Sequence, residues 1–252
     1  MKDLISIVIP FYKKKEFFAE TIKSVKNQKY KNYEILLIYD DPDKSLLPYI
    51  KKILKKIKNK RIFINKKNYG AGHSRNIGIK KAKGNFIAFL DADDTWNKNK
   101  LLSQLNFMKH QKCDFSFTSY SIINNRGQIL KKIKAKNEIS YNDLLNSCDI
   151  GLSTVLMKKK LFKNLKFPKL KTKEDFVLWL RLSKKKIQML GIKKNLSYWR
   201  KTEYSLSSSI TQKLRDSFTV YYKYLEFNWI KSIIYILILS VNSIRKRYDD
   251  SY

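Results

Sequence analysis

Three carboxylates follow an apolar run in the stretch GNFIAFLDADDTW, residues 84–96. Asp91, Asp93 and Asp94 stand in a chain of 252 residues whose formal net charge is +33. Carboxylates at the end of a buried strand are unfavourable unless a positive group neutralises them. Mg²⁺ or Mn²⁺ suits two converging carboxylates and keeps coordination positions for phosphate oxygens. The stretch therefore predicts a metal site that receives a nucleotide diphosphate.

A structural role is the alternative for these aspartates. Asp is a favourable N-cap residue, and a helix is expected to start near Asn97. Capping applies best to Asp94 and less well to the cluster as a whole. Both interpretations are open at this point.

Apolar runs alternate with helix-period segments through the first half of the chain. Strands are predicted at residues 4–9, 34–39, 61–64 and 86–90, and helices at 16–28, 51–60 and after the glycines of NYGAGHSRN. This rhythm indicates an α/β fold with a parallel sheet covered on both faces. Ligands of such sheets bind beyond the carboxyl ends of the strands, where the acidic segments 39–41 and 90–94 fall.

The pattern changes after residue 95. A helix is expected at 98–110, a hairpin around NNRG within 114–133, and a further helix from about Glu174. Cys113 and Cys148 have no metal-like spacing and are expected to be reduced thiols.

The basic composition raises nucleic acid as a partner, but we expect none. Only eight of the 54 basic residues are arginine, the side chain favoured for reading bases and clamping phosphates. The lysines are spread along the chain, and those of 51–60 occupy the polar face of an expected helix. Such charge is also suited to an anionic membrane surface.

Four blocks of the sequence resemble the inverting family 2 glycosyltransferases with the GT-A fold. They are ISIVIPFYKKKEFFAETIKSVKNQKYKNYEILLIYDD, NYGAGHSRNIGIKKAKG, NFIAFLDADD and KEDFVLWLRL. The resemblance implies a Rossmann-like, mostly parallel central sheet flanked by helices. It also implies a GT-A domain at 1–210, divided into a nucleotide-sugar-binding half (1–95) and an acceptor-side half (96–210), followed by a helical extension at 211–252.

The resemblance assigns roles on the donor side. Pro10 and Tyr12 belong to a loop that contacts the nucleotide, and Asp40 and Asp41 match the acid expected to accept a hydrogen bond from uracil. The family commonly continues with Gly-Ser, whereas this chain has PDKS, so the loop on the base side differs from the family pattern. Arg75 matches an arginine near the base and pyrophosphate, a role that a permanently charged guanidinium suits.

The same resemblance makes Asp91 and Asp93 a DxD motif. Asp93 is then the chief Mn²⁺ or Mg²⁺ contact, Asp91 faces the donor ribose or sugar, and Asp94 assists either one. A metal ion and Arg75 together would stabilise the charge on the departing nucleotide diphosphate.

Transfer to a hydroxyl also requires a base, and KEDF supplies two carboxylates. By resemblance Asp175 is that base, while Glu174 is a candidate substrate contact. Trp179 lies one turn after Asp175, which predicts an aromatic wall beside a sugar. Acidic residues are also favourable in the first turn of a helix, which is the alternative for this pair.

A second departure from the family lies in LSYWRKTEYSLSSS, residues 196–209. Tyr198, Arg200, Ser205 and Ser207 fit the family pattern, but Thr202 stands where a histidine is frequent. Arg200 is a candidate to replace that histidine at the pyrophosphate.

The C-terminal stretch 227–248 bears on location. Its uninterrupted apolar run of about ten residues is shorter than the roughly twenty needed to span a bilayer, and a basic segment follows it. It predicts a helix that lies in a membrane interface or, equally well, packs against protein. No N-terminal signal is recognised, so we expect a cytoplasmic protein, peripheral on the inner face of the plasma membrane.

These features lead to one main hypothesis. It is an inverting, metal-dependent glycosyltransferase that moves a sugar from a nucleotide-sugar donor, with UDP expected, to a glycan or lipid-linked acceptor in bacterial lipopolysaccharide or capsule biosynthesis. A nucleotidyltransferase and a basic nucleic-acid-binding module are the alternatives. A nucleotidyltransferase usually has a glycine-rich phosphate loop early in the chain, whereas PFYKKKEF of this chain has lysines without glycine. A nucleic-acid-binding module needs no metal.

Overall fold

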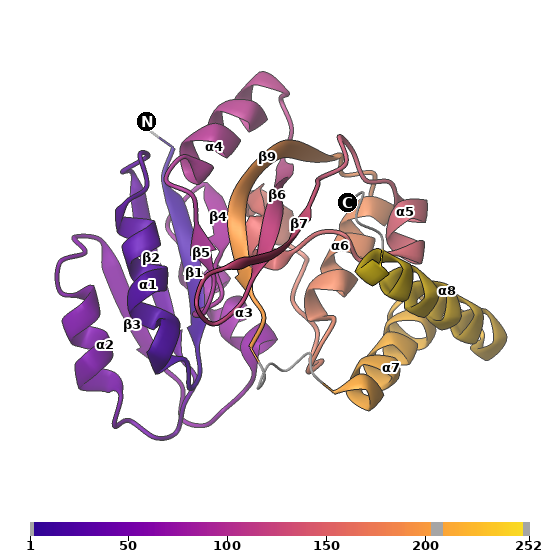
Figure 1. Ribbon diagram of the computed structural model, residues 1–252, viewed down its shortest axis with the longest axis horizontal. Helices are drawn as coiled ribbons and strands as arrows, with labels where there is room; N and C mark the ends of the chain where they lie inside the picture. Colours follow the sequence, from indigo (N-terminus) through magenta and orange to yellow (C-terminus); the bar gives the residue numbers. More distant parts are fainter. Residues whose placement is uncertain (1–2, 203–208, 249–252) are drawn as a thin grey trace.

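The computed structural model describes residues 3–202 and 209–248. Within that part of the chain, nine strands form one sheet (Figure 1). Their order is β3 (Lys60–Ile64), β2 (Tyr33–Tyr39), β1 (Ile5–Phe11), β4 (Phe86–Phe89), β8 (Leu156–Lys158), β6 (Phe115–Ile123), β9 (Met189–Arg200) and β5 (Thr95–Trp96), and β7 (Ile129–Ile133) pairs with β6.

The first four strands along the chain are parallel neighbours. β1 pairs with β2 and β4, and β2 pairs with β3. The predicted α/β sheet flanked by helices is therefore confirmed. Because parallel strands end at one edge, the residues that follow β1, β2 and β4 come together there.

Both faces of this sheet are buried, which explains the nearly continuous apolar runs. Ile7 and Ile9 of β1 face a core shared with α1 (Lys15–Lys26), α2 (Leu47–Leu54) and α4 (Lys100–His110). Val8 faces the other core, which is covered by α3 (Ala71–Lys81) and α6 (Glu174–Lys184).

The second half of the sheet reverses direction at β8. β8 is antiparallel to both β4 and β6, and β6 forms the predicted hairpin with β7 around residues 124–127. β9 runs parallel to β6, with irregular register near Ser119. No strand was predicted at β9, because exposed lysines at 193 and 194 interrupt its apolar pattern.

Two local expectations are wrong. The helix expected at 51–60 begins earlier, at Leu47, where Pro48 occupies the first turn, and it ends at Leu54. Glycine often ends a helix, which predicts that the helix after NYGAGHSRN ends at Gly84, but α3 stops at Lys81. A Cβ at Gly84 would lie 2.5 Å from the Leu4 carbonyl oxygen, so this glycine is required for the close approach to β1.

The C-terminal segment is helical, as predicted. It consists of α7 (Ile210–Thr219), a short π-helix η4 (Val220–Tyr224) and α8 (Trp229–Tyr248). Val220 and Tyr221 are fully buried and belong to the same core cluster as the buried residues of α6. Within the described ranges, none of the helices combines the length and the hydropathy required to cross a bilayer.

Candidate active site

A cavity of about 1400 Å³ lies at the carboxyl edge of the parallel strands. Its walls come from the segments after β1, β2 and β4, from the start of α6 and from the end of β9. It collects most of the predicted site residues, namely Pro10, Tyr12, Asp40, Arg75, Asp91, Asp93, Asp94, Glu174, Asp175 and Arg200. Asp41 and Trp179 do not line it.

Arg75 joins two carboxylates that are distant in sequence. Its Nη2 donates to Asp91 Oδ1 at 2.7 Å, and its Nη1 donates to Glu174 Oε1 at 2.6 Å. Arg75 is 3% exposed, and although burial lowers the pKa of its guanidinium, the two anions outweigh this and raise it. Both terminal nitrogens are therefore engaged in fixing carboxylates from β4 and α6. A direct contact between Arg75 and pyrophosphate stays a prediction.

Lys14 is a site residue that sequence reasoning missed. Its Nζ lies 2.8 Å from Asp93 Oδ2 and donates to Thr202 Oγ1 at 3.1 Å. Burial raises the pKa of Asp93, and the nearby Asp91 charge adds to the rise, whereas Lys14 opposes it. The only sequence signal was the lysine run after β1, which also has the composition of a solvated surface.

Asp94 has a structural role. It is 1% exposed and accepts hydrogen bonds from Ser153 Oγ at 2.5 Å and from the Arg200 backbone N–H at 2.9 Å. Burial, with the charges of Asp93 and Asp91, raises its pKa well above the usual range. The helix-capping alternative is wrong, because α4 starts at Lys100 and Asn99, its N-cap residue, makes no side-chain cap bond.

Arg200 orders the aspartate loop. It is 1% exposed, and its Nε donates to the Asp93 carbonyl oxygen at 3.0 Å. Its Nη1 donates to the carbonyl oxygens of Asn124 and Asn125, and its Nη2 pairs with Glu20 at 2.5 Å. Since these donors are satisfied by protein, the expectation that Arg200 replaces a pyrophosphate-binding histidine is not supported. Ser205 and Ser207 lie outside the described residues.

The donor-side aspartates differ from each other. Asp40 lines the cavity and accepts hydrogen bonds from Asn65 Nδ2 (2.7 Å) and from the backbone N–H groups of Tyr69 (2.9 Å) and Gly70 (2.8 Å). It thereby holds the loop before α3 in place. Asp41 is buried and accepts from the Asp43 N–H, so the structure does not bring it to the cavity.

The first strand presents two predicted residues at the same edge. Pro10 and Tyr12 both line the cavity, and the Tyr12 ring is 39% exposed. An exposed aromatic face at a cavity is available for stacking against a flat ligand.

Asp175 lines the cavity from the first turn of α6. Its Oδ1 accepts from the Phe176 N–H at 2.8 Å, and burial raises its pKa while the Arg75 charge opposes the rise. Lys173, at the helix N-cap, has a left-handed φ of 65° that sets the direction in which the chain enters α6. Burial raises the pKa of the neighbouring Glu174 to about 7, even though Arg75 is its ion-pair partner.

The aromatic wall predicted at Trp179 is wrong. Trp179 is fully buried, and its ring lies edge-on to Phe115 with centroids 5.1 Å apart. Residues 176–180 are all buried, so one turn after Asp175 the helix is already inside the core.

The carboxylates of the cavity come from two separate parts of the chain. Asp91 and Asp93 lie after β4, Asp175 lies at α6, and Arg75 connects the two sides. Among the described residues, no three His, Cys, Asp or Glu side chains form a metal-binding group. Asp91 and Asp93 are the two that could contribute to holding a cation.

A family model for "Glycosyl transferase family 2" matches residues 6–166. The chain belongs to glycosyl transferase family 2. The matched range includes β1 to β8 and the loop that carries Asp91 and Asp93. This confirms the resemblance found in the sequence, and the protein is a glycosyltransferase.

One relative of this glycosyltransferase has a name that specifies a donor and an acceptor. The chain is 34% identical over 249 residues to the UDP-Glc:alpha-D-GlcNAc-diphosphoundecaprenol beta-1,3-glucosyltransferase WfgD of Escherichia coli. The match covers 98% of this chain and 96% of that relative.

Solved structures show the same fold. S. aureus TarS 1-349, in complex with UDP-GlcNAc, superposes with a TM-score of 0.69 at 19% identity, over 92% of this chain and 70% of that one. The mannosyltransferase PcManGT from Pyrobaculum calidifontis, in complex with GDP-Man and Mn2+, gives 0.70 at 10% identity, over 94% and 70%. At these identities the likeness establishes the fold, and the chain has the fold of these GT-A enzymes.

Proposed function

We propose that this glycosyltransferase transfers a sugar from a UDP-sugar to a hydroxyl group of a lipid-linked glycan, with inversion at the anomeric carbon. The observation that carries the proposal is the cavity on which Asp91, Asp93 and Asp175 meet, with Arg75 bridging its two sides. The relative WfgD, whose name specifies UDP-Glc and a diphosphoundecaprenol-linked acceptor, supports the donor and the acceptor class. Lipopolysaccharide or capsule biosynthesis is the proposed setting.

The donor nucleotide is proposed to lie along the ends of β1 and β2. Tyr12 offers an aromatic face to the base, Pro10 shapes the wall, and Asp40 reaches the cavity from the end of β2. Both Asp40 oxygens already accept backbone or amide N–H groups, so its first task is to hold the loop of Tyr69 and Gly70 against the nucleotide.

Asp91 and Asp93 fit a divalent cation. Burial raises the pKa of Asp93, and the nearby charge of Asp91 adds to the rise. A cation between the two carboxylates would relieve their repulsion. Two carboxylates leave most of the shell of Mg²⁺ or Mn²⁺ for phosphate oxygens and water. When bound, such an ion stabilises negative charge on the leaving diphosphate. Arg75 holds Asp91 in position, and Lys14 holds Asp93.

Asp175 is proposed to be the general base. It takes the proton of the acceptor hydroxyl as that oxygen attacks the anomeric carbon, and the bond from that carbon to the phosphate oxygen breaks. The electron pair of that bond leaves with the nucleotide diphosphate. Attack from the face opposite the leaving group gives inversion, and a base at Asp175, on a different element of the cavity from Asp91 and Asp93, suits such an attack.

A screen of nucleotide sugars with a lipid-linked or soluble glycan acceptor tests this function. We expect transfer from a UDP-sugar, with the anomeric configuration of the product inverted. Asp175→Asn should lower kcat about 10²- to 10⁴-fold, the usual contribution of a positioned base. Asp114→Asn, which changes a surface carboxylate paired with Lys158 and Lys160, is the matched control and should keep its activity. Unchanged turnover in Asp175→Asn would remove the base assignment.

A further inference from the structure

α8 has two apolar faces, although only one of them packs against the protein. On the inner face, Leu239 and Ser232 are buried, and Tyr235 and Ile236 pack against the core. The outer face carries large apolar side chains that are between 42% and 62% exposed. They are Trp229, Ile230, Ile233, Ile234, Leu237, Val241 and Ile244, here called the outer face of α8. A helix on the surface of a water-soluble domain normally has polar residues on that side.

The charges on α8 are all positive. The segment from Trp229 to Tyr248 contains no Asp or Glu, and it includes the exposed Lys231 and Arg245. An apolar stripe bordered by basic groups is complementary to a surface that has an apolar interior and anionic headgroups. Trp229, at the first residue of the helix, is a residue type favoured at membrane–water interfaces.

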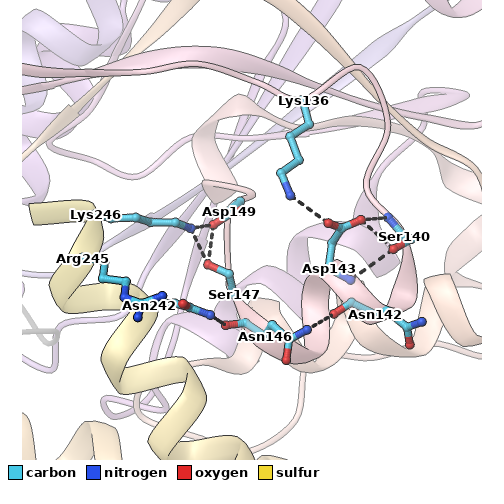
Figure 2. A pocket seen from close by; sticks show the side chains of 10 residues that line it. All are labelled: Lys136, Ser140, Asn142, Asp143, Asn146, Ser147, Asp149, Asn242, Arg245 and Lys246. Atoms are coloured by element: carbon cyan, nitrogen blue, oxygen red, sulfur yellow. Dashed lines mark hydrogen bonds and ion pairs between the residues drawn. The ribbon is translucent and has the colours of Figure 1, made fainter. Parts of the chain in front are cut away.

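Figure 2 shows that α8 is fixed to the body of the enzyme. Asn242 donates to the Asn146 carbonyl oxygen at 3.0 Å, and the Lys246 ammonium contacts Ser147 and Asp149. Asn146 ends α5 (Tyr141–Asn146), and α5 packs against α6, whose first turn carries Asp175. A surface that binds the outer face of α8 would therefore orient the whole active site.

The active-site cavity reaches these C-terminal helices. Lys213 of α7 and Ser243 of α8 line the same cavity as Asp175. We propose that the outer face of α8 docks onto an anionic membrane surface, with the helix lying in the interface. The proposal rests on the lipid-linked acceptor of the proposed function. Docking would present the acceptor side of the cavity to the headgroup layer, where the diphosphate of such an acceptor lies.

A second copy of the chain fits this face less well. Two outer faces in contact would bring Lys231 and Arg245 of each copy near like charges, with no acidic residue on α8 to pair with them. An anionic lipid surface offers the opposite charge.

Vesicle co-sedimentation tests the proposal with the full chain. Wild type should bind phosphatidylglycerol-rich vesicles and bind pure phosphatidylcholine vesicles much more weakly. The double variant Ile233→Ser/Leu237→Ser should weaken binding about tenfold or more, because burial of two aliphatic side chains is lost. Its matched control is Ile64→Ser/Ile129→Ser, which removes similarly exposed isoleucines from β3 and β7 (Figure 1) and should bind like wild type.

Three results would overturn the proposal. They are no binding of wild type to the anionic vesicles, equal binding by the outer-face variant, and a wild-type dimer in sedimentation that the outer-face variant converts to a monomer. UDP titration of the same proteins in solution reports on the donor site separately. Loss of vesicle binding with UDP binding retained would therefore count against docking alone. Loss of UDP binding with vesicle binding retained would count against the proposed function alone.

Discussion

At the scale of single residues, the carboxylates of the cavity fall into two kinds. Asp91 and Glu174 pair with Arg75, and Asp93 pairs with Lys14. Within the described residues Asp175 has no ion-pair partner, and its carboxylate accepts a hydrogen bond from the next backbone N–H, that of Phe176. It is therefore the carboxylate with the greatest freedom to accept a proton.

The pH dependence of transfer follows from burial of Asp175. Burial raises its pKa above the usual value of about 3.9, and a base works only when deprotonated. We expect kcat/KM to fall as the pH drops through that raised pKa, so that the acid limb lies above about pH 4. The measurement is kcat/KM as a function of pH, with the affinity for UDP measured at each pH. The affinity for UDP reports on protonation of Asp93 and so separates it from protonation of Asp175. A rate that stays flat down to about pH 4 would contradict the prediction.

At the level of secondary-structure elements, the close approach of the backbones of β1 and the segment before β4 positions the carboxylates that follow β4. β1 and β4 end beside each other at the cavity, and β4 follows Gly84, which lies directly against the backbone of Leu4 and Ser6. The Gly84 N–H also donates to Ser6 Oγ at 2.9 Å. Space for a side chain is absent at this crossing.

Gly84→Ala should therefore lower the free energy of unfolding by about 1–3 kcal/mol, the usual cost of overpacking. The added Cβ would lie 2.5 Å from the Leu4 oxygen, and β1 must shift to avoid it. Urea unfolding measures the change. The control is Gly151→Ala, whose Cβ would meet its nearest atom at 3.4 Å and which should cost less than about 0.5 kcal/mol. Equal stability of the two variants would show that the approach to β1 is not tight.

At the scale of the whole molecule, the C-terminal helices are part of the enzyme's core. Tyr221 is fully buried, lies edge-on to Phe176 of α6, and donates from its hydroxyl to the Leu145 carbonyl oxygen at 2.7 Å. Asp216 accepts hydrogen bonds from Thr172 at 2.8 Å, just before α6. α7 and η4 thus support the element that carries Asp175. The division of the chain into a domain at 1–210 and an extension at 211–252 stays a prediction.

Tyr221→Ala should destabilise the whole protein by about 3–5 kcal/mol, as for other large buried aromatics. The neighbouring Tyr222 is 52% exposed, and Tyr222→Ala should cost less than about 1 kcal/mol. Chemical unfolding followed by a probe in the N-terminal half measures both. If Tyr221→Ala left that half unchanged, the C-terminal helices would be an independent unit.

The sequence predicts the strands that are buried along their whole length. It does not predict contacts between side chains that are distant along the chain. The strands that end at the cavity are nearly continuous apolar runs, so β1, β2 and β4 and the acids after them were predictable. The Arg75–Glu174 pair joins residues 99 positions apart, and no local pattern indicates it. The prediction for Trp179 was wrong because helical spacing shows which residues share a face of α6 but does not show whether that face lines the cavity or is buried in the core.

Titration calorimetry of UDP with and without Mn²⁺ tests most directly the claim that Asp91 and Asp93 hold a cation for the leaving diphosphate. Mn²⁺ should tighten UDP binding to wild type by about tenfold or more, which corresponds to about 1.4 kcal/mol. Asp93→Ala should lose that gain, and Asp175→Asn should keep it. The same dissociation constant for wild type with and without Mn²⁺, or an undiminished gain in Asp93→Ala, would contradict the account.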